Sequence, residues 1–310
     1  MGIAHFDDAP AREVEVGHLT ARWTYLGEGA GSRVAGVRRL QVRAGGWSTP
    51  AHEHSAEEEI FYVLSGRGLS WQAGRTAEIG PGDCIVYLPK RGAHTLHAVE
   101  ELDVLAFGPR LHPETLRFPR LDRSAVGTGF FESSPGYVDG APTQFLREAE
   151  LGPPELPEPS QRPPTIINVA EVAPDRWDRP RIASTRRDLG DAVGSIDTGL
   201  GHVEVDPGMQ ATPLHCHSME EEIFVVLDGE GLLLLGQEEA PVTPGTVVAR
   251  PAATGVAHAL RAGDSGLTYL VYGTRVPGDM CYYPHSNKIG FRGLGVIGRL
   301  ERLDYWDGED

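Results

Sequence analysis

The sequence predicts an all-β protein with two tandem domains, each a small antiparallel β-sandwich or barrel. An internal repeat indicates two domains: EEEIFYVL at 57–64 and EEEIFVVL at 220–227 differ at one position of eight. A series of short apolar runs separated by turn residues indicates strands. No long run with helical periodicity competes with them, so we expect any helices to be short and peripheral.

The predicted strands are rich in β-branched and aromatic residues and are bounded by Gly, Pro, Asp and Ser. In chain order they are IFYVL (60–64), CIVYL (84–88), DVLAF (103–107), IFVVL (223–227), GLLLL (231–235), TVVAR (246–250) and TYLVY (268–272). The turns repeat as well, because the 163-residue offset between the glutamate runs also places PGD at 81–83 onto PGT at 244–246. Such spacing is typical of small β-sandwiches and barrels.

A proline-rich stretch separates the two copies. ELGPPELPEPSQRPP at 150–164 can neither continue a helix nor donate fully to a sheet, so it predicts an extended linker. The sequence therefore predicts a first domain at 1–149 and a second at 165–310. Within the first, residues 109–149 are expected to form an irregular extension with room for one short helix.

The charge balance excludes several classes of partner. A formal net charge of −16 would repel phosphate backbones and anionic lipid surfaces, and no long basic run offsets it. We therefore expect a small-molecule substrate and neither nucleic acid nor a membrane as partner. Either a monomer or a homo-oligomer is compatible with the sequence, because the two halves could pack together within one chain.

The cysteines and the N-terminus indicate a reducing compartment. Cys84, Cys216 and Cys281 are odd in number and lack C-x-x-C spacing, so neither a disulfide framework nor a cysteine zinc site is predicted. MGIAHFDDAP lacks the basic start and apolar stretch of a signal peptide, and no apolar run is long enough to span a bilayer. We expect a cytoplasmic protein.

Each copy contains two histidines separated by one residue. His52 with His54, and His215 with His217, would point to the same face of a strand because side chains alternate with period two. Neutral imidazole is the commonest protein ligand for a transition metal. A later histidine in each copy, His94 or His258, follows a Pro/Gly turn that can return a strand beside the first. Six of the twelve histidines thus fall into matched sets.

One glutamate of each triplet is expected to complete the set. Glu59 and Glu222 stand directly before a predicted strand and precede a turn glycine by seven positions, so they are the predicted ligands. Glu58 and Glu221 are the next candidates, and the first glutamates, at 57 and 220, are expected in solvent. Two metal sites are therefore predicted, each with three histidines and one carboxylate.

Both halves resemble the cupin superfamily, and the whole chain is similar to a duplicated-domain cupin, or bicupin. The first family motif joins a glycine, H-x-H, a glutamate and a glycine, and it is matched by Gly46, His52, His54, Glu59 and Gly66, and again by Gly208, His215, His217, Glu222 and Gly229. The second motif is matched less regularly, and the asparagine that often follows its histidine is replaced by His97 or Arg261. The resemblance implies two jelly-roll barrels, each holding one divalent metal.

Other residues are expected to line the pockets. Phe61 and Phe224 lie two positions beyond the predicted glutamate ligands and should share their inward face. His97 is a candidate for the pocket rim, and Arg250 could meet an anionic substrate, although a surface position is the alternative. Cys216 should face away from the metal because it alternates with the two histidines.

A donor set of three histidines and one carboxylate suits Fe(II), with Mn, Ni or Zn as alternatives, and leaves coordination positions open. The favoured hypothesis is a non-haem Fe(II) dioxygenase acting on a small enol, diketone or aromatic substrate that chelates the metal through oxygen. A redox-neutral Mn- or Zn-dependent decarboxylase or isomerase is the second hypothesis. A non-catalytic bicupin that binds metal and ligand is the third.

Overall fold

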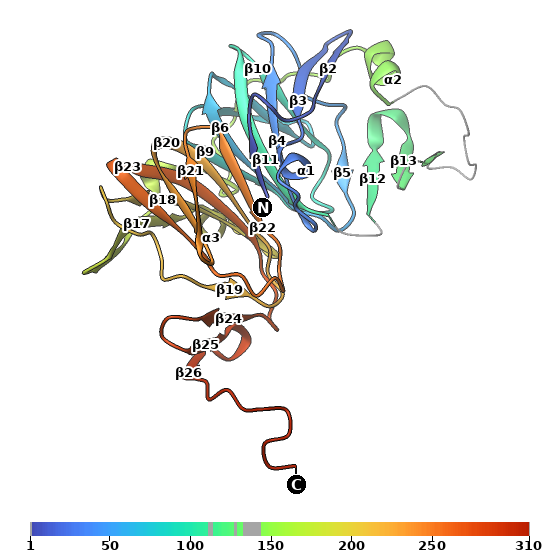
Figure 1. The fold of residues 1–310 in the computed structure, drawn as a ribbon. Helices are drawn as coiled ribbons and strands as arrows, with labels where there is room; N and C mark the ends of the chain where they lie inside the picture. Colours follow the sequence, from blue (N-terminus) through green and yellow to red (C-terminus); the bar gives the residue numbers. More distant parts are fainter. Residues whose placement is uncertain (1, 111–113, 127–128, 133–143, 310) are drawn as a thin grey trace.

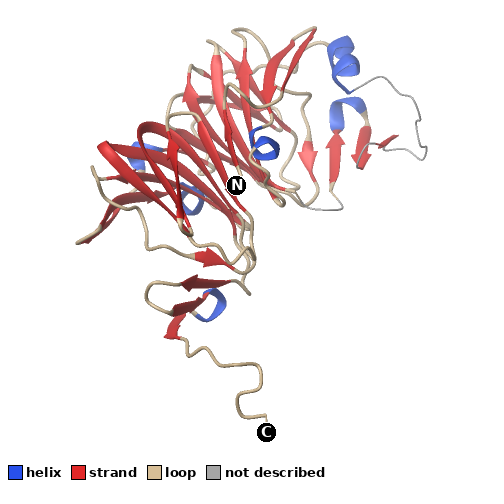
Figure 2. Ribbon diagram, in the orientation of Figure 1, coloured by secondary structure: helices blue, strands red, loops and turns tan. Residues whose placement is uncertain are grey.

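The structure is a computed structural model, and it describes residues 2–110, 114–126, 129–132 and 144–309. Strands dominate both domains, which lie side by side (Figure 1), and the few helices are short (Figure 2). The predicted all-β class and the tandem jelly-roll architecture are confirmed, although the opposed sheets do not close into a continuous barrel. No helix within the described ranges is long and apolar enough to cross a lipid bilayer.

The first domain consists of two antiparallel sheets around an apolar core. Its strands are β2 (Ala11–Val16), β3 (Leu19–Thr24), β4 (Ala35–Val42), β5 (Glu53–His54), β6 (Glu59–Ser65), β7 (Gly68–Gln72), β8 (Arg75–Ile79), β9 (Asp83–Tyr87), β10 (His94–Ala98) and β11 (Leu102–Pro109). One sheet has the order β9-β6-β11-β4-β3-β2, and the other has the order β10-β7-β8. Phe61, Leu96 and Val104 meet between them in the core.

The second domain repeats this plan with longer strands. It contains β16 (Asp175–Arg179), β17 (Ile182–Asp188), β18 (Thr198–Val205), β19 (Cys216–His217), β20 (Glu222–Leu235), β21 (Glu238–Val242), β22 (Thr246–Arg250) and β23 (His258–Thr274). The β20–β23 ladder shifts register between Val226 and Asp228 and again between Gly229 and Gly231. Such bulges bend a strand pair, so β20 and β23 pass through both layers of the domain.

The two domains exchange one strand each. β1 (Ile3–His5) precedes the first domain but pairs with β22 of the second. β15 (Ile166–Asn168) follows the linker and pairs with β9 of the first domain. Because β1 and β15 occupy equivalent positions in the two repeats, the exchange is reciprocal and ties each domain to the other through backbone hydrogen bonds.

The faces between the domains form one continuous apolar core. Short helices α1 (Leu26–Gly29) and α3 (Leu189–Val193) border this core, in which Ile60 and Phe107 of the first domain meet Ile223 and Tyr272 of the second. The Phe107 and Tyr272 rings stack with centroids 5.2 Å apart. Because buried side chains of both domains belong to one apolar cluster, the two domains form a single unit.

The side chain of the middle glutamate of each triplet is hydrogen-bonded to the other domain. Glu58 is 1% exposed and accepts hydrogen bonds from the backbone N–H groups of Ile196, Asp197 and Thr198, at 2.8, 3.1 and 2.8 Å. The hydroxyl groups of Ser195 and Thr198 also donate to it.

Glu221 makes the symmetric contact in the opposite direction. It is fully buried and accepts from the backbone N–H groups of Arg33, Val34 and Ala35 at 2.7, 2.5 and 2.8 Å. Glu58 and Glu221 therefore join the domains, and their carboxylates are occupied by the opposite chain segment. Their candidacy as metal ligands was wrong.

The proline-rich linker lies extended along the first domain. The Trp71 indole donates to the carbonyl of Glu155 at 3.0 Å, and the Thr76 hydroxyl donates to that of Pro157 at 2.9 Å. Beyond β15, the short 3-10 helix η2 (Val169–Glu171) begins at a capping box formed by Asn168 and Glu171. The linker is thus held by side chains of β7 and β8 over much of its length.

An additional sheet follows the last strand of each domain. After the first come β12 (Thr115–Phe118), η1 (Pro119–Leu121), β13 (Arg123–Val126), β14 (Gly129–Glu132) and α2 (Gln144–Leu151), so the expected irregular extension contains three strands as well as the short helix. After the second come β24 (Met280–Tyr283), β25 (Lys288–Phe291), η3 (Arg292–Leu294) and β26 (Val296–Arg299). β12 pairs with β5, and β24 pairs with β19, so each extension lies beside its H-x-H strand (Figure 1).

Replacement of Glu58 by alanine is expected to destabilise the protein by about 3 kcal/mol, because several buried donors lose their charged acceptor. The measurement is the urea concentration at half unfolding. Glu78→Ala, an exposed glutamate on β8, serves as the matched control and should leave that midpoint unchanged. Equal midpoints for the two variants would contradict the proposed role of the contact.

Candidate metal centres

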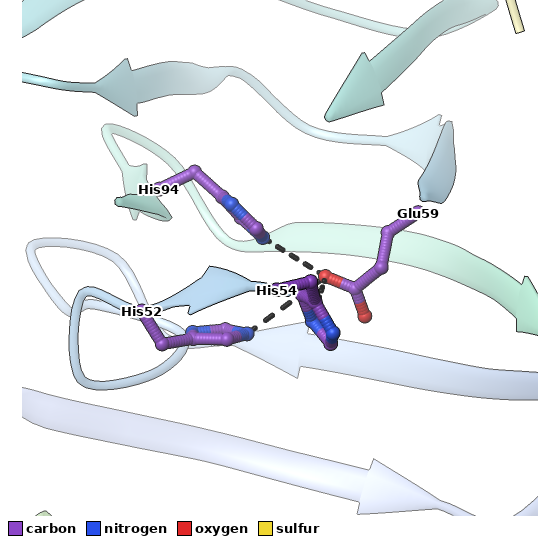
Figure 3. A group of neighbouring side chains, drawn as sticks. All are labelled: His52, His54, Glu59 and His94. Atoms are coloured by element: carbon purple, nitrogen blue, oxygen red, sulfur yellow. Dashed lines mark hydrogen bonds and ion pairs between the residues drawn. The ribbon is translucent and has the colours of Figure 1, made fainter. Parts of the chain in front are cut away.

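The first candidate centre consists of His52, His54, Glu59 and His94, which come from three neighbouring segments (Figure 3). His54 ends β5, Glu59 begins β6 and His94 begins β10. A backbone bridge joins His52 to His94 through N–H to carbonyl contacts of 3.2 and 2.8 Å. The sheet ladders therefore place all four side chains together, although His94 lies far along the chain from the others.

The imidazoles point their Nε2 atoms at one carboxylate oxygen. Glu59 Oε2 lies 2.9 Å from His94 Nε2, 3.2 Å from His54 Nε2 and 3.8 Å from His52 Nε2 (Figure 3). The four donor atoms all lie within 4.8 Å of one another. Since metal–nitrogen and metal–oxygen bonds are about 2.0–2.2 Å long, donors to one ion must be grouped on this scale. The set fits a divalent transition metal.

The protonation states also fit a metal. Burial, with the neighbouring histidines His94 and His54, lowers the pKa of His52 to about 3, and burial likewise lowers that of His94. Burial alone would raise the pKa of Glu59, but charge and hydrogen bonds from His54 and His94 hold it well below the ordinary value. Burial lowers the pKa of His54, but Glu59, Glu114 and Glu57 outweigh burial and raise it. At neutral pH the first centre therefore combines a carboxylate with two neutral imidazoles, and a proton on His54 would be released on metal binding.

The second candidate centre consists of His215, His217, Glu222 and His258. Its second histidine lies farther from the glutamate oxygen than its counterpart in the first centre does. Glu222 Oε2 lies 2.8 Å from His258 Nε2, 3.6 Å from His217 Nε2 and 3.7 Å from His215 Nε2. Burial lowers the pKa of His258 to about 4. His215, Glu222 and His258 have donor atoms within 4.8 Å of one another, whereas His217 is grouped with His215 and a further residue, Cys281.

Backbone carbonyls orient the first histidine of each pair. His52 Nδ1 lies 2.9 Å from the carbonyl oxygen of Pro50, and His215 Nδ1 lies 2.8 Å from that of Pro213. A hydrogen bond at Nδ1 fixes the tautomer that leaves Nε2 free to bind a metal. The prolines two residues before each H-x-H pair thus contribute to both centres.

A carboxylate next to each extension lies beside the second histidine of the pair, and in the second domain it is hydrogen-bonded to that histidine. Asp279 Oδ2 lies 2.7 Å from His217 Nδ1, and Asp279 Oδ1 accepts from the backbone N–H groups of Met219 and Glu220 at 2.9 and 3.2 Å. Burial opposes ionisation of Asp279, but these donors lower its pKa to about 2. Glu114 has the equivalent place in the first domain, with Oε1 3.9 Å from His54 Nδ1. Sequence analysis missed both, because the extensions follow the last barrel strand and carry no motif.

The first glutamates of the triplets have unequal surroundings. Glu220 is 3% exposed, forms an ion pair with Arg292 and accepts the Val276 N–H at 2.8 Å, so its predicted solvent position was wrong. Glu57 is half-buried, with Oε2 3.9 Å from His54 Nδ1.

Of the other predicted pocket residues, Arg250 lies beside the second centre, whereas His97 points away from the first. Arg250 is not at the surface: it is buried opposite Glu222 on the neighbouring strand and donates to Thr254 and the Val256 carbonyl. His97 packs against Trp47, with ring centroids 4.9 Å apart, because it lies three positions beyond His94 and points to the other side of β10.

The two predicted phenylalanines lie at the centres. Phe61 meets the His94 ring edge-on, with centroids 6.4 Å apart, and Phe224 meets His258 at 5.5 Å. The position equivalent to Arg250 in the first domain is Tyr87, whose ring stacks on His94 with centroids 4.0 Å apart. Each centre therefore has an apolar wall, but only the second has a buried cation beside its glutamate.

A cavity of about 890 Å³ opens from the first centre. Its walls include three of the four candidate ligands, His52, His54 and Glu59, together with aromatic side chains and arginines from the sheet and the extension: Arg12, Trp23, Tyr25, Arg38, Phe61, Arg110, Phe118 and Phe145. Arg38 lies over the rings of Trp23 and Tyr25, at 5.9 and 5.5 Å from their centroids. The cavity thus joins a candidate metal site to an aromatic and cationic wall.

Comparison with known proteins supports the repeat and the fold. A family model described as Cupin domain matches the chain twice, at residues 38–107 and 201–272. Auxin-binding protein 1 of Arabidopsis thaliana is 33% identical over 98 residues, which cover 30% of this chain and 44% of that protein. An uncharacterized protein of Methanocaldococcus jannaschii is 31% identical over 74 residues, which cover 23% of this chain and 58% of that protein. The chain therefore spans about half the length of the curated relatives it matches.

Solved structures extend the likeness to both domains. Oxalate decarboxylase of Bacillus subtilis superposes with a TM-score of 0.57 at 16% sequence identity, covering 88% of this chain and 76% of that one. At this identity the likeness concerns the fold, and it spans both repeats and their connection.

Glu59→Gln and Glu222→Gln are each expected to lower the metal content of the purified protein toward half, because an amide replaces the anionic donor of one centre. The double variant should lose most of the metal. Elemental analysis measures the content, and Glu78→Ala is the control. Full retention of metal in both single variants would show that these glutamates are not the ligands.

Asp279→Asn is expected to weaken metal binding at the second centre by about 10–100-fold, because the partner that orients His217 loses its charge. Competition with a chelator measures the affinity of each centre. Asp264→Asn, an exposed position on β23, is the control. Unchanged affinity at both centres would contradict an orienting role for Asp279.

Proposed function

The chain belongs to the cupin superfamily as a duplicated-domain protein, and we propose that it is a metal-dependent enzyme whose first centre is catalytic. The reaction best supported is that of a non-haem Fe(II) dioxygenase acting on an anionic aromatic or enolic substrate. The second centre would also bind a metal, and the substrate cavity described above opens from the first centre.

The main support for this proposal is that candidate metal ligands of the first domain line a cavity. His52, His54 and Glu59 all face the cavity, so a substrate inside it would reach a metal bound by them. Closed structural metal sites have no such access. A volume of about 890 Å³ lies in the upper range of small-molecule pockets and accommodates a substrate with an aromatic body.

The walls suit an anion with an apolar body. Arg12 and Arg38 both line the cavity, and Arg38 is oriented by the two aromatic faces of Trp23 and Tyr25. Within the described residues Arg38 forms no ion pair with a carboxylate, so its charge remains available to a ligand. Phe61 lines the side nearest His94 and keeps water from that face of the centre.

An iron ion held by the first centre would supply open positions for a chelating substrate and for dioxygen, and electrons for oxygen activation. The surrounding residues bind and orient the substrate and do little proton transfer. Tyr87, the nearest phenol, is engaged by the Ser70 hydroxyl at 2.6 Å, and burial raises its pKa. Tyr87 is therefore a poor general acid, so the proposed oxygen chemistry does not depend on it.

Redox-neutral decarboxylation is the second candidate. The fold resembles that of oxalate decarboxylase, an enzyme with Mn(II) centres, and the same donor set accommodates Mn(II). In such a reaction Glu57, which lines the cavity beside His54, would hold the transferred proton. The similarity to auxin-binding protein 1 favours a third possibility, ligand binding without catalysis.

Oxygen uptake distinguishes these functions. The Fe(II)-loaded protein, offered aromatic and enolic acids, is expected to consume dioxygen in proportion to product, and the Mn(II)- or Zn(II)-loaded protein is not. His52→Ala should abolish uptake, whereas His285→Ala, an exposed histidine, should retain it. Equal turnover without oxygen, with release of carbon dioxide, would contradict the dioxygenase hypothesis and support the decarboxylase. Saturable binding of a ligand without turnover would contradict both and support a binding protein.

A further inference from the structure

The second centre has a sulfur donor that its counterpart lacks. Cys281 lies on β24, directly opposite His217 in the β19–β24 ladder. Cross-strand partners share one face of a sheet, so the thiol is directed toward the histidines. Its Sγ, one ring nitrogen of His215 and one ring nitrogen of His217 lie within 4.8 Å of one another.

The first centre offers an internal comparison. There β12 pairs with β5 in the same manner, but the residue opposite His54 is Leu116. The neighbouring aromatic position is Phe118 in the first domain and Tyr283 in the second, at 6.1 and 6.0 Å from the rings of His52 and His215. The repeated architecture thus presents an apolar surface to one centre and a thiol to the other.

We propose that Cys281 is a metal ligand of the second centre, which therefore binds a thiophilic ion such as Zn(II) or Co(II) in preference to Mn(II). The donors would be His215, His217, Glu222 and His258 together with the Cys281 sulfur. Binding exchanges the S–H bond for a metal–sulfur bond and releases one proton to solvent, with no change of oxidation state.

The charge of the second centre is consistent with this assignment. Arg250 stands opposite Glu222, where the first domain has Tyr87 opposite Glu59. A thiolate adds one negative charge, and the buried guanidinium adds one positive charge. The charge of Arg250 would therefore offset that of the thiolate, and neither group has a counterpart at the same position of the first domain.

The Cys281 thiol would ionise when the metal binds. A bound cation deprotonates a coordinating thiol outright. Soft thiolate ligands favour zinc and related ions, whereas the oxygen- and imidazole-only set of the first centre has no such preference.

Cobalt spectroscopy on the full-length protein tests the proposal. After metal removal by a chelator, titration with Co(II) is expected to produce a thiolate-to-cobalt charge-transfer band in the near ultraviolet. Cys281→Ser should lose the band, and Cys216→Ala, which changes the neighbouring cysteine of β19, should retain it. His52→Ala, which affects only the first centre, should also retain it.

Absence of the band in the wild-type protein with two cobalt ions bound, or its persistence in Cys281→Ser, would overturn the proposal. X-ray absorption at the zinc edge of the wild-type protein gives a second test that needs no variant. With both centres filled, we expect about half a sulfur scatterer per zinc at about 2.3 Å, because only one of the two centres has a thiolate, and a shell of nitrogen and oxygen alone would contradict the proposal. Both measurements report binding and not turnover, so their outcome is independent of the proposed catalytic function.

Discussion

The structure depends on one constraint, which is that a buried carboxylate must be satisfied by donors or cations. Each repeat places three glutamates in succession, and adjacent residues point in opposite directions along an extended chain. Glu58 and Glu221 therefore point into the domain interface, while Glu59 and Glu222 point inward to the histidines. One short motif thus builds the contact between the domains and a candidate metal centre on the opposite side.

The same arrangement links the sites to the assembly of the chain. Backbone N–H groups of one domain satisfy the glutamate of the other, and β1 and β15 are exchanged between the sheets. Neither β6 nor β20 can shift its register without moving a ligand and an interface carboxylate together. Duplication of the domain has therefore produced a reciprocal pair of domains within one chain. The residue of the extension that faces the second histidine differs between them: it is Leu116 in the first domain and Cys281 in the second.

Sequence reasoning identified what is local or periodic. The strands follow from apolar runs, and the histidine pairs, the later histidines and the last glutamates follow from alternation and from the repeat. The exchanged strands and the donors to Glu58 could not be predicted, because their partners belong to the other domain and lie far away along the chain. Cys281, Glu114 and Asp279 were missed because only the pairing of the extensions with β5 and β19 brings them to the histidines. The sequence left open whether Arg250 lies in the pocket or at the surface, because its burial depends on the opposing strand.

The most direct test of this account is the anomalous diffraction signal of crystals of the metal-loaded protein, recorded at the absorption edge of the bound metal. We expect two peaks per chain, one among His52, His54, Glu59 and His94 and one among His215, His217, Glu222 and His258. A peak at neither quartet, or metal bound only elsewhere on the chain, would contradict the claim that the repeated motif builds two metal centres.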